Sequence, residues 1–238
     1  MGTPGARRVV CSGPMLLPEL EARDLAELSI FPLPNVTLFP GALLPLHVFE
    51  PRYRELTADA LAGKKLMGIA RLKPGFEQDY EGRPPIFDVC GVGAIEHYEA
   101  RSDGRYDIAL RGLARARIVE ERPPLRSYRQ VRAELLHDLP VEPALVAAWQ
   151  VKLGSLWERL ASHLPEPVRD LRALTRGADD ASAYADRLAA AMVADPDACQ
   201  QLLSEVDPAE RLRLLTARVQ ELVDALAPPV TGQSHRLN

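Results

Sequence analysis

The feature that most constrains the fold is a change of hydrophobic periodicity along the chain. In the first part, short apolar stretches are separated by Pro and Gly, and the apolar residues Tyr106, Ile108 and Leu110 occupy every second position. Between residues 143 and 227, apolar residues instead recur every three or four positions. A period of two is typical of half-buried strands, and a period near 3.6 is typical of helices. The order predicts an α+β fold with a β unit first and a helical unit second.

The β unit contains several short strand candidates separated by turn residues. Pro40-Gly41 and Ser102-Asp103-Gly104 are turn signals, because glycine accepts the positive φ that such turns require. One helix interrupts this unit, with Pro51 at its first position and Gly63 just past its end. Frequent prolines predict edge or bulged strands, and the number of strands predicts a small barrel or sandwich. The strand candidates are 43–49, 67–72, 86–92, 94–100, 106–111, 113–120 and 128–136.

The helical unit is predicted to be a bundle. Its last helix has the clearest start, because Asp207 can cap it and Pro208 suits its first position. Two leucine-rich stripes are expected to form the bundle core, although the second could also dock a partner helix. The first stripe is Leu145, Trp149, Leu153, Leu156 and Leu160, and the second is Leu212, Leu215, Val219, Leu222 and Leu226.

The domain organisation follows from these patterns. We expect the β unit to span 25–138 and the bundle to span 139–228, with flexible tails at 1–24 and 229–238. The 238 residues provide enough chain to bury a core without disulfides.

The composition and the N-terminal sequence argue against a membrane-spanning protein and against an exported one. No stretch approaches the ~20 apolar residues of a membrane helix, and no apolar region of a signal peptide follows Arg7-Arg8. The three scattered cysteines favour a reducing compartment, so we expect a cytoplasmic protein. The sequence leaves open whether the chain starts at Met1 or Met15.

No pattern of residues predicts catalysis. Gly63-Lys64-Lys65 lacks the spacing and the hydroxyl residue of a phosphate loop. The five histidines lack metal-ligand spacing, and Lys152 and Ser155 are read as a helix surface pair. Cys90 lies in an apolar strand, where burial makes a thiol inert. We therefore expect no catalytic residue, no metal and no cofactor.

Arginines gather between residues 101 and 132, where nine arginines accompany only four acidic residues. A β barrel with a basic face can bind RNA, although no aromatic residues interleave here as in common RNA-binding motifs. Nucleic-acid or nucleotide binding is therefore kept as an alternative function. Its candidate residues are Arg111, Arg115, Arg117 and Arg129.

Several segments carry a family resemblance. Residues 31–41 read FPLPNVTLFPG, and residues 44–54 read LPLHVFEPRYR. Residues 103–108 and 111–118 read DGRYDI and RGLARARI, and residues 200–207 read QQLLSEVD. With these motifs the chain resembles the N-terminal, substrate-binding domain of Lon proteases over roughly residues 26–227.

The resemblance implies a PUA-like, bulged β pseudobarrel followed by a helical bundle. It also implies a non-enzymatic module without the ATPase and protease parts of Lon, which binds unfolded polypeptide or a specific protein partner. The Pro- and Gly-containing loop at 73–85 is the expected binding loop, with Phe76 and Tyr80 as its anchors. Phe49 is expected to be a core residue. No membrane role is expected, and the oligomeric state is not predicted.

Overall fold

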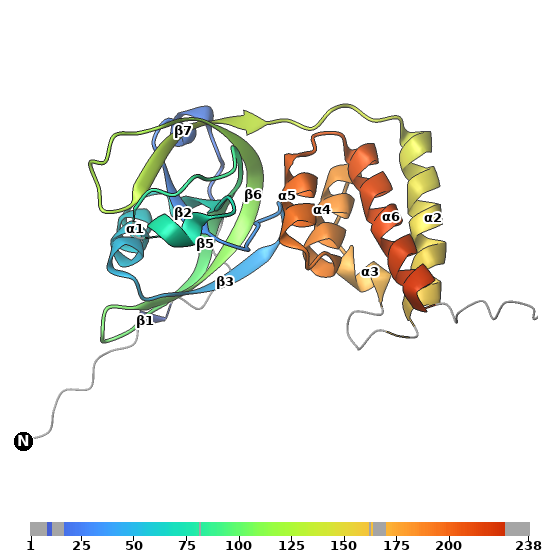
Figure 1. Ribbon diagram of the computed structural model, residues 1–238, viewed down its shortest axis with the longest axis horizontal. Coiled ribbons are helices and arrows are strands. Elements are labelled where there is room, and N and C mark those ends of the chain that lie inside the picture. Colours follow the sequence, from blue (N-terminus) through green and yellow to red (C-terminus); the bar gives the residue numbers. More distant parts are fainter. Residues whose placement is uncertain (1–8, 11–16, 81, 162, 164–169, 227–238) are drawn as a thin grey trace, which may run out of the picture.

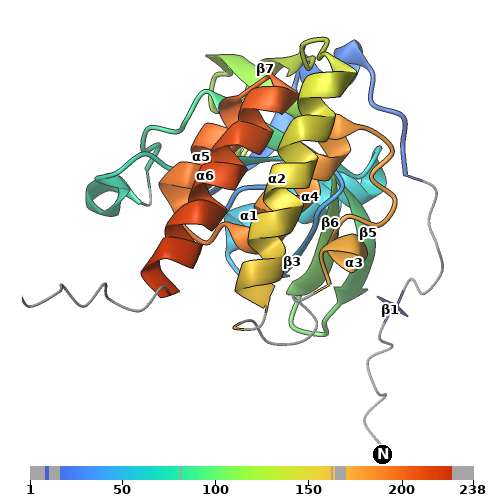
Figure 2. The same ribbon diagram turned by 90° about the vertical axis from the view of Figure 1, so that its right-hand side faces the viewer.

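The structure of the chain is a computed structural model that describes residues 9–10, 17–80, 82–161, 163 and 170–226. A β unit and a helical unit lie side by side (Figure 1). Helices α4 (Ala181–Met192) and α5 (Pro196–Ser204) lie next to the β unit. Helices α2 (Pro143–Ala161) and α6 (Pro208–Leu226) form the far side of the bundle, nearest the viewer in Figure 2. The predicted α+β class is confirmed.

The β unit is one mixed sheet that curves back on itself. Its neighbours follow the order β1-β5-β4-β2-β7-β6-β3, and β5 also pairs with β6, so that the sheet forms a pseudobarrel. Among the described strands, only β2 and β4 pair in parallel. The strands are β1 (Val9–Val10), β2 (Leu28–Leu33), β3 (Leu43–Val48), β4 (Leu66–Arg71), β5 (Val89–Ala100), β6 (Tyr106–Glu121) and β7 (Arg129–Leu136).

Two glycines expected to separate strands lie inside longer ones. The predicted pair 86–92 and 94–100 is the single strand β5, and the pair 106–111 and 113–120 is the single strand β6. The residue in the second gap, Gly112, lies against another stretch of backbone, since an added Cβ would lie 2.0 Å from the carbonyl oxygen of Phe39. Here glycine permits close backbone approach rather than a turn.

Helix α1 (Pro51–Ala62) begins and ends where the sequence predicts, with Pro51 first and Gly63 as the C-terminal cap. Its buried face carries Tyr53 and Leu56, and the Tyr53 ring stacks on Phe31 of β2 at a centroid distance of 3.9 Å. This packing holds the first turn of α1 against the barrel.

The helical unit also contains the short helix α3 (Leu171–Leu174). The N-terminal cap of α6 is as predicted, because Asp207 accepts a hydrogen bond from the Ala209 amide at 2.9 Å. The predicted core stripes are partly wrong: Leu145 is 48% exposed, and Leu222 and Leu226 are also exposed. In α2, the two predicted steps of four from Leu145 to Leu153 drift around a helix of 3.6 residues per turn. In α6, the buried face continues from Val219 to Val223 rather than to Leu222. The core therefore uses Val146, Trp157 and Val223 instead.

The segment expected as a flexible tail at 1–24 contains ordered structure. Strand β1 pairs with Glu99 and Ala100 of β5, and a short 3-10 helix, η1 (Ala22–Leu25), ends at the fully buried Leu25. The division of the chain at 25–138 and 139–228 stays a proposal. Phe49, expected in the core, is 57% exposed, because it follows the last residue of β3, where its ring stacks on the exposed His47 with centroids 6.0 Å apart.

The two units share an apolar interface. Phe39 and Val89 of the β unit belong to the apolar cluster of the bundle, whereas Leu38 belongs to the cluster inside the barrel. The side chain of Gln200 in α5 also donates to the Val89 carbonyl at 3.0 Å. Leu38 and Phe39, which are consecutive in the chain, thus belong to two different cores.

A buried ionic cluster joins the same two units. Arg115 of β6 donates to both carboxylate oxygens of Asp186 in α4, and its Nε donates to the Leu203 carbonyl at 3.0 Å. Arg211 of α6 also donates to Asp186, at 2.5 Å, and to Asp138 at 2.5 Å. Two buried arginines are therefore balanced by the buried Asp186 and the partly exposed Asp138.

Candidate functional site

The loop between β4 and β5 carries the aromatic residues predicted as anchors. Its base is closed by the Lys73 amide, which donates to the Pro85 carbonyl at 2.8 Å. Within the loop, the short 3-10 helix η2 (Phe76–Asp79) brings the rings of Phe76 and Tyr80 to a centroid distance of 6.2 Å. Both residues are half-buried. The loop therefore has a defined shape, and the two rings lie together.

Tyr80 attaches the loop to the start of α1. Its hydroxyl donates to Glu50 at 3.1 Å, and the Arg52 guanidinium lies over its ring, 5.3 Å from the centroid. Burial, and next the nearby Glu50 carboxylate, raise the pKa of Tyr80. Tyr80 is thus a part of the loop's attachment, while Phe76 is the less constrained of the two rings.

A pocket with a volume of about 310 Å³ lies beside this attachment. Residues of the α1 start, of the end of the aromatic loop and of the β6–β7 connection line it. Its charged lining residues are Arg52, Arg83, Arg126 and Arg129, and no described lining residue is acidic. A smaller hollow shares the lining residues Arg52, Tyr53 and Arg129 with this pocket, and Tyr80 also lines it. Sequence reasoning missed this pocket, because its arginines come from three separate segments.

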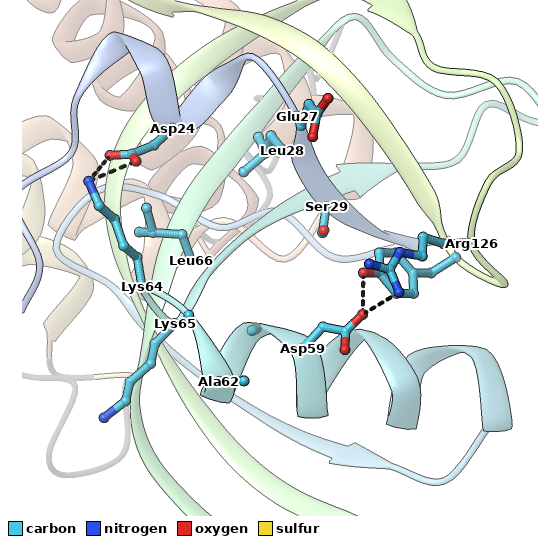
Figure 3. Close-up of a pocket in the computed structure, with 13 residues that line it drawn as sticks. Asp24, Glu27, Leu28, Ser29, Asp59, Ala62, Lys64, Lys65, Leu66 and Arg126 are labelled. Atoms are coloured by element: carbon cyan, nitrogen blue, oxygen red, sulfur yellow. Dashed lines mark hydrogen bonds and ion pairs between the residues drawn. The ribbon is translucent and has the colours of Figure 1, made fainter.

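A second pocket, of about 440 Å³, lies near the C-terminal end of α1 (Figure 3). Opposite charges pair across it: Lys64 contacts Asp24 at 2.8 Å, and Arg126 contacts Asp59 at 3.5 Å. The hydrogen bond from Lys64 is the main reason why the pKa of Asp24 is lowered. Because acidic and basic side chains are paired here, the pocket has no clear preference for a positive or a negative ligand. It is therefore the weaker candidate for a binding site.

The arginines of the nucleic-acid alternative do not form one exposed face. Arg115 lies in the buried ionic cluster described above. Arg129 is buried as well, and it donates to both carboxylate oxygens of Glu121, at 2.7 and 2.8 Å. Both guanidinium groups are thus already bound by acidic side chains, and a nucleic-acid contact by Arg115 and Arg129 stays a prediction.

The other two predicted arginines have acidic partners. Arg111 donates to Glu96 at 2.7 Å, a bond that lowers the pKa of this carboxyl, and to the Gly41 carbonyl at 2.9 Å. Arg117 is exposed and contacts Asp88 at 3.1 Å. Both guanidinium groups thus make ion pairs with acidic side chains of the protein itself.

Metal-ligating side chains do not cluster in the described part of the chain. No group of three or more His, Cys, Asp or Glu side chains in the described ranges could hold a metal ion. Burial raises the pKa of Cys90 to about 12, and the Ser155 hydroxyl donates to the Lys152 carbonyl. Among the described helices, none is long and apolar enough to cross a membrane.

Sequence reasoning also missed the interface residue Asp186. A signal was present, because Asp186 lies beside Ala185 and between apolar positions of the α4 core face. A carboxylate on a buried helix face requires a partner. The sequence does not reveal which partner, since Arg115 is 71 residues away along the chain.

Comparison with solved structures supports the fold. The N-terminal domain of a Lon protease from the Mycobacterium avium complex aligns with a TM-score of 0.63 and 20% identity, covering 82% of this chain and 98% of that one. A Lon N-terminal domain protein from Xanthomonas campestris aligns with a TM-score of 0.55 and 24% identity, covering 80% and 97%.

Sequence comparison gives the same relationship. A Lon protease of Anaeromyxobacter dehalogenans is 27% identical over 216 residues, which are 89% of this chain and 25% of that protein. Lon protease 2 of Myxococcus xanthus is 27% identical over 192 residues, 79% of this chain and 23% of that protein. The chain thus spans about a quarter of the length of these relatives. A family model described as the ATP-dependent protease La (LON) substrate-binding domain matches residues 27–221, so the chain belongs to the family of Lon substrate-binding domains.

Proposed function

We propose that this protein is a non-catalytic module that binds unfolded or exposed polypeptide segments, or acts as an adaptor for them. Membership of a substrate-binding family is the observation that carries the proposal. The aromatic loop supplies the physical means, because Phe76 and Tyr80 present two neighbouring rings on a loop with a defined shape. We place this function in the cytoplasm, where Cys90 and Cys199, both free thiols in the structure, would stay reduced.

Replacing Phe76 with Ala is expected to weaken binding of a labelled, permanently unfolded polypeptide about five-fold, because the ring would lose apolar area to bury. Tyr80→Phe keeps the ring and removes the bond to Glu50, so it is expected to have a smaller effect. Fluorescence anisotropy titration measures both dissociation constants. Val151→Ala is the matched control, because Val151 is 74% exposed on α2, outside the β unit.

Equal affinities for wild type and Phe76→Ala would remove the loop from the binding surface. If the wild-type protein does not bind the unfolded polypeptide, the general proposal fails and a single folded partner becomes the better explanation. A labelled structured RNA serves as the second probe. Binding of RNA that falls steeply with salt would favour the nucleic-acid alternative instead, and exposed Arg117 would then be the first residue to replace.

A further inference from the structure

The 310 Å³ pocket beside α1 combines a positive lining with available hydrogen-bond donors. The carboxylates that contact its arginines do not line it. Glu121 contacts Arg129 at 2.7 Å, and Asp59 contacts Arg126 at 3.5 Å, yet neither acid is among the described lining residues. The opening is therefore bordered by guanidinium groups, with their acidic partners set outside the lining.

The four arginines are not equally available. Arg129 is buried, is bound by Glu121 through two bonds and donates to the Pro84 carbonyl, so it is a rigid part of the wall. Arg83 and Arg126 differ from it. Their side chains are 37% and 53% exposed, and their closest acidic partners lie at 3.4 and 3.5 Å. Each guanidinium has five N–H donors, so both retain donors for a ligand.

The pocket and the aromatic loop form a continuous surface. The small hollow that reaches Tyr80 shares Arg52, Tyr53 and Arg129 with the charged pocket. A polypeptide that placed an apolar side chain on the rings of the loop could place a neighbouring side chain in the pocket. Planar guanidinium groups bind carboxylates with directed, charge-assisted hydrogen bonds.

We infer that this pocket binds the carboxylate of an Asp or Glu side chain, so that the protein selects acidic polypeptide segments. This inference rests on the proposed polypeptide binding and names the class of polypeptide that it selects. Arg83 and Arg126 are the residues that recognise the carboxylate, and Arg129 and Tyr128 also line the pocket. The net charge of the chain is −4, so the preference for acidic segments comes from this pocket and opposes the overall charge.

The test compares two labelled unfolded peptides that differ only by Glu in one and Gln in the other. Both peptides carry an amidated C-terminus, so that side chains supply the only carboxylates. The wild-type protein is expected to bind the Glu peptide about ten-fold more tightly than the Gln peptide. In the double variant Arg83→Gln/Arg126→Gln the two dissociation constants should become equal, with the value for the Gln peptide unchanged. Added salt should reduce the preference.

Arg218→Gln is the matched control, because Arg218 is 51% exposed on α6 and also has an acidic partner, Glu221, at 3.0 Å. This control should keep the ten-fold preference. Urea denaturation of each variant verifies that it is folded. Equal binding of the two peptides by wild type, or a preference that survives in the double variant, would overturn the inference and leave the proposed function standing. Failure of both peptides to bind would overturn both.

Discussion

Replacing Asp186 with Ala is expected to lower the free energy of unfolding by about 3–5 kcal/mol, because it leaves buried positive charge without compensation. Arg115 and Arg211 both converge on this carboxylate, and each of the three side chains is at most 3% exposed. Asp138 is the remaining acid of the cluster, 2.5 Å from Arg211 and 3.9 Å from Arg115, so the variant leaves two guanidinium groups with one carboxylate. Urea denaturation followed by tryptophan fluorescence measures the loss, since Trp157 is buried in the bundle core.

An exposed ion pair provides the control for this variant. Glu221→Gln removes the partner of Arg218 at the surface of α6, and it should change the free energy of unfolding by less than about 0.5 kcal/mol. The quadruple variant Arg115→Met/Asp138→Asn/Asp186→Leu/Arg211→Met removes all four charges of the cluster while retaining most of the volume. It should recover much of the stability that Asp186→Ala loses. A loss below about 1 kcal/mol for Asp186→Ala would show that the cluster is not the buried ionic contact described here.

Replacing Gly112 with Ala is expected to lower the free energy of unfolding by about 3 kcal/mol. The new methyl group would lie 2.0 Å from the carbonyl oxygen of Phe39, which is backbone and cannot rotate away. The Gly112 amide also donates to the Ala42 carbonyl, and its carbonyl accepts from the Gly41 amide, both at 2.9 Å. Any shift that relieves the clash would therefore strain these bonds as well.

Gly154→Ala is the matched substitution, because Gly154 lies within α2 and an added Cβ would meet nothing within 4 Å. Alanine in a helix interior should raise the free energy of unfolding by about 0.5–1 kcal/mol. Thermal and urea denaturation of the two variants should move in opposite directions. Equal stability of Gly112→Ala and wild type would contradict the close approach of Phe39 to β6.

The elements that could be predicted from sequence are those whose cause is local. Pro51 with Gly63 marks both ends of α1, and Asp207 marks the start of α6, because caps act within a few residues. The PUA-like pseudobarrel followed from the family motifs. The continuity of β6 through Gly112 could not be predicted, because it depends on Phe39, which is distant in the chain.

The candidate site was predicted only in part for the same reason. Phe76 begins η2 and Tyr80 directly follows it, so their rings lie together, whereas the partner that holds Tyr80 is Glu50, 30 residues earlier. Arginine density suggested a basic surface around residues 101–132. The arginine density could not reveal that Arg115 is buried, because its burial depends on how α4, with Asp186, packs against β6.

Leu38 and Phe39 are consecutive residues, yet one belongs to the barrel core and the other to the bundle core. Because this segment packs into both cores, it cannot act as a hinge between the two units. The buried ionic cluster connects the same two units. The two units should consequently melt in one cooperative transition and tumble together in solution. A polypeptide held at the aromatic loop would then be displayed at a constant orientation relative to α2 and α6.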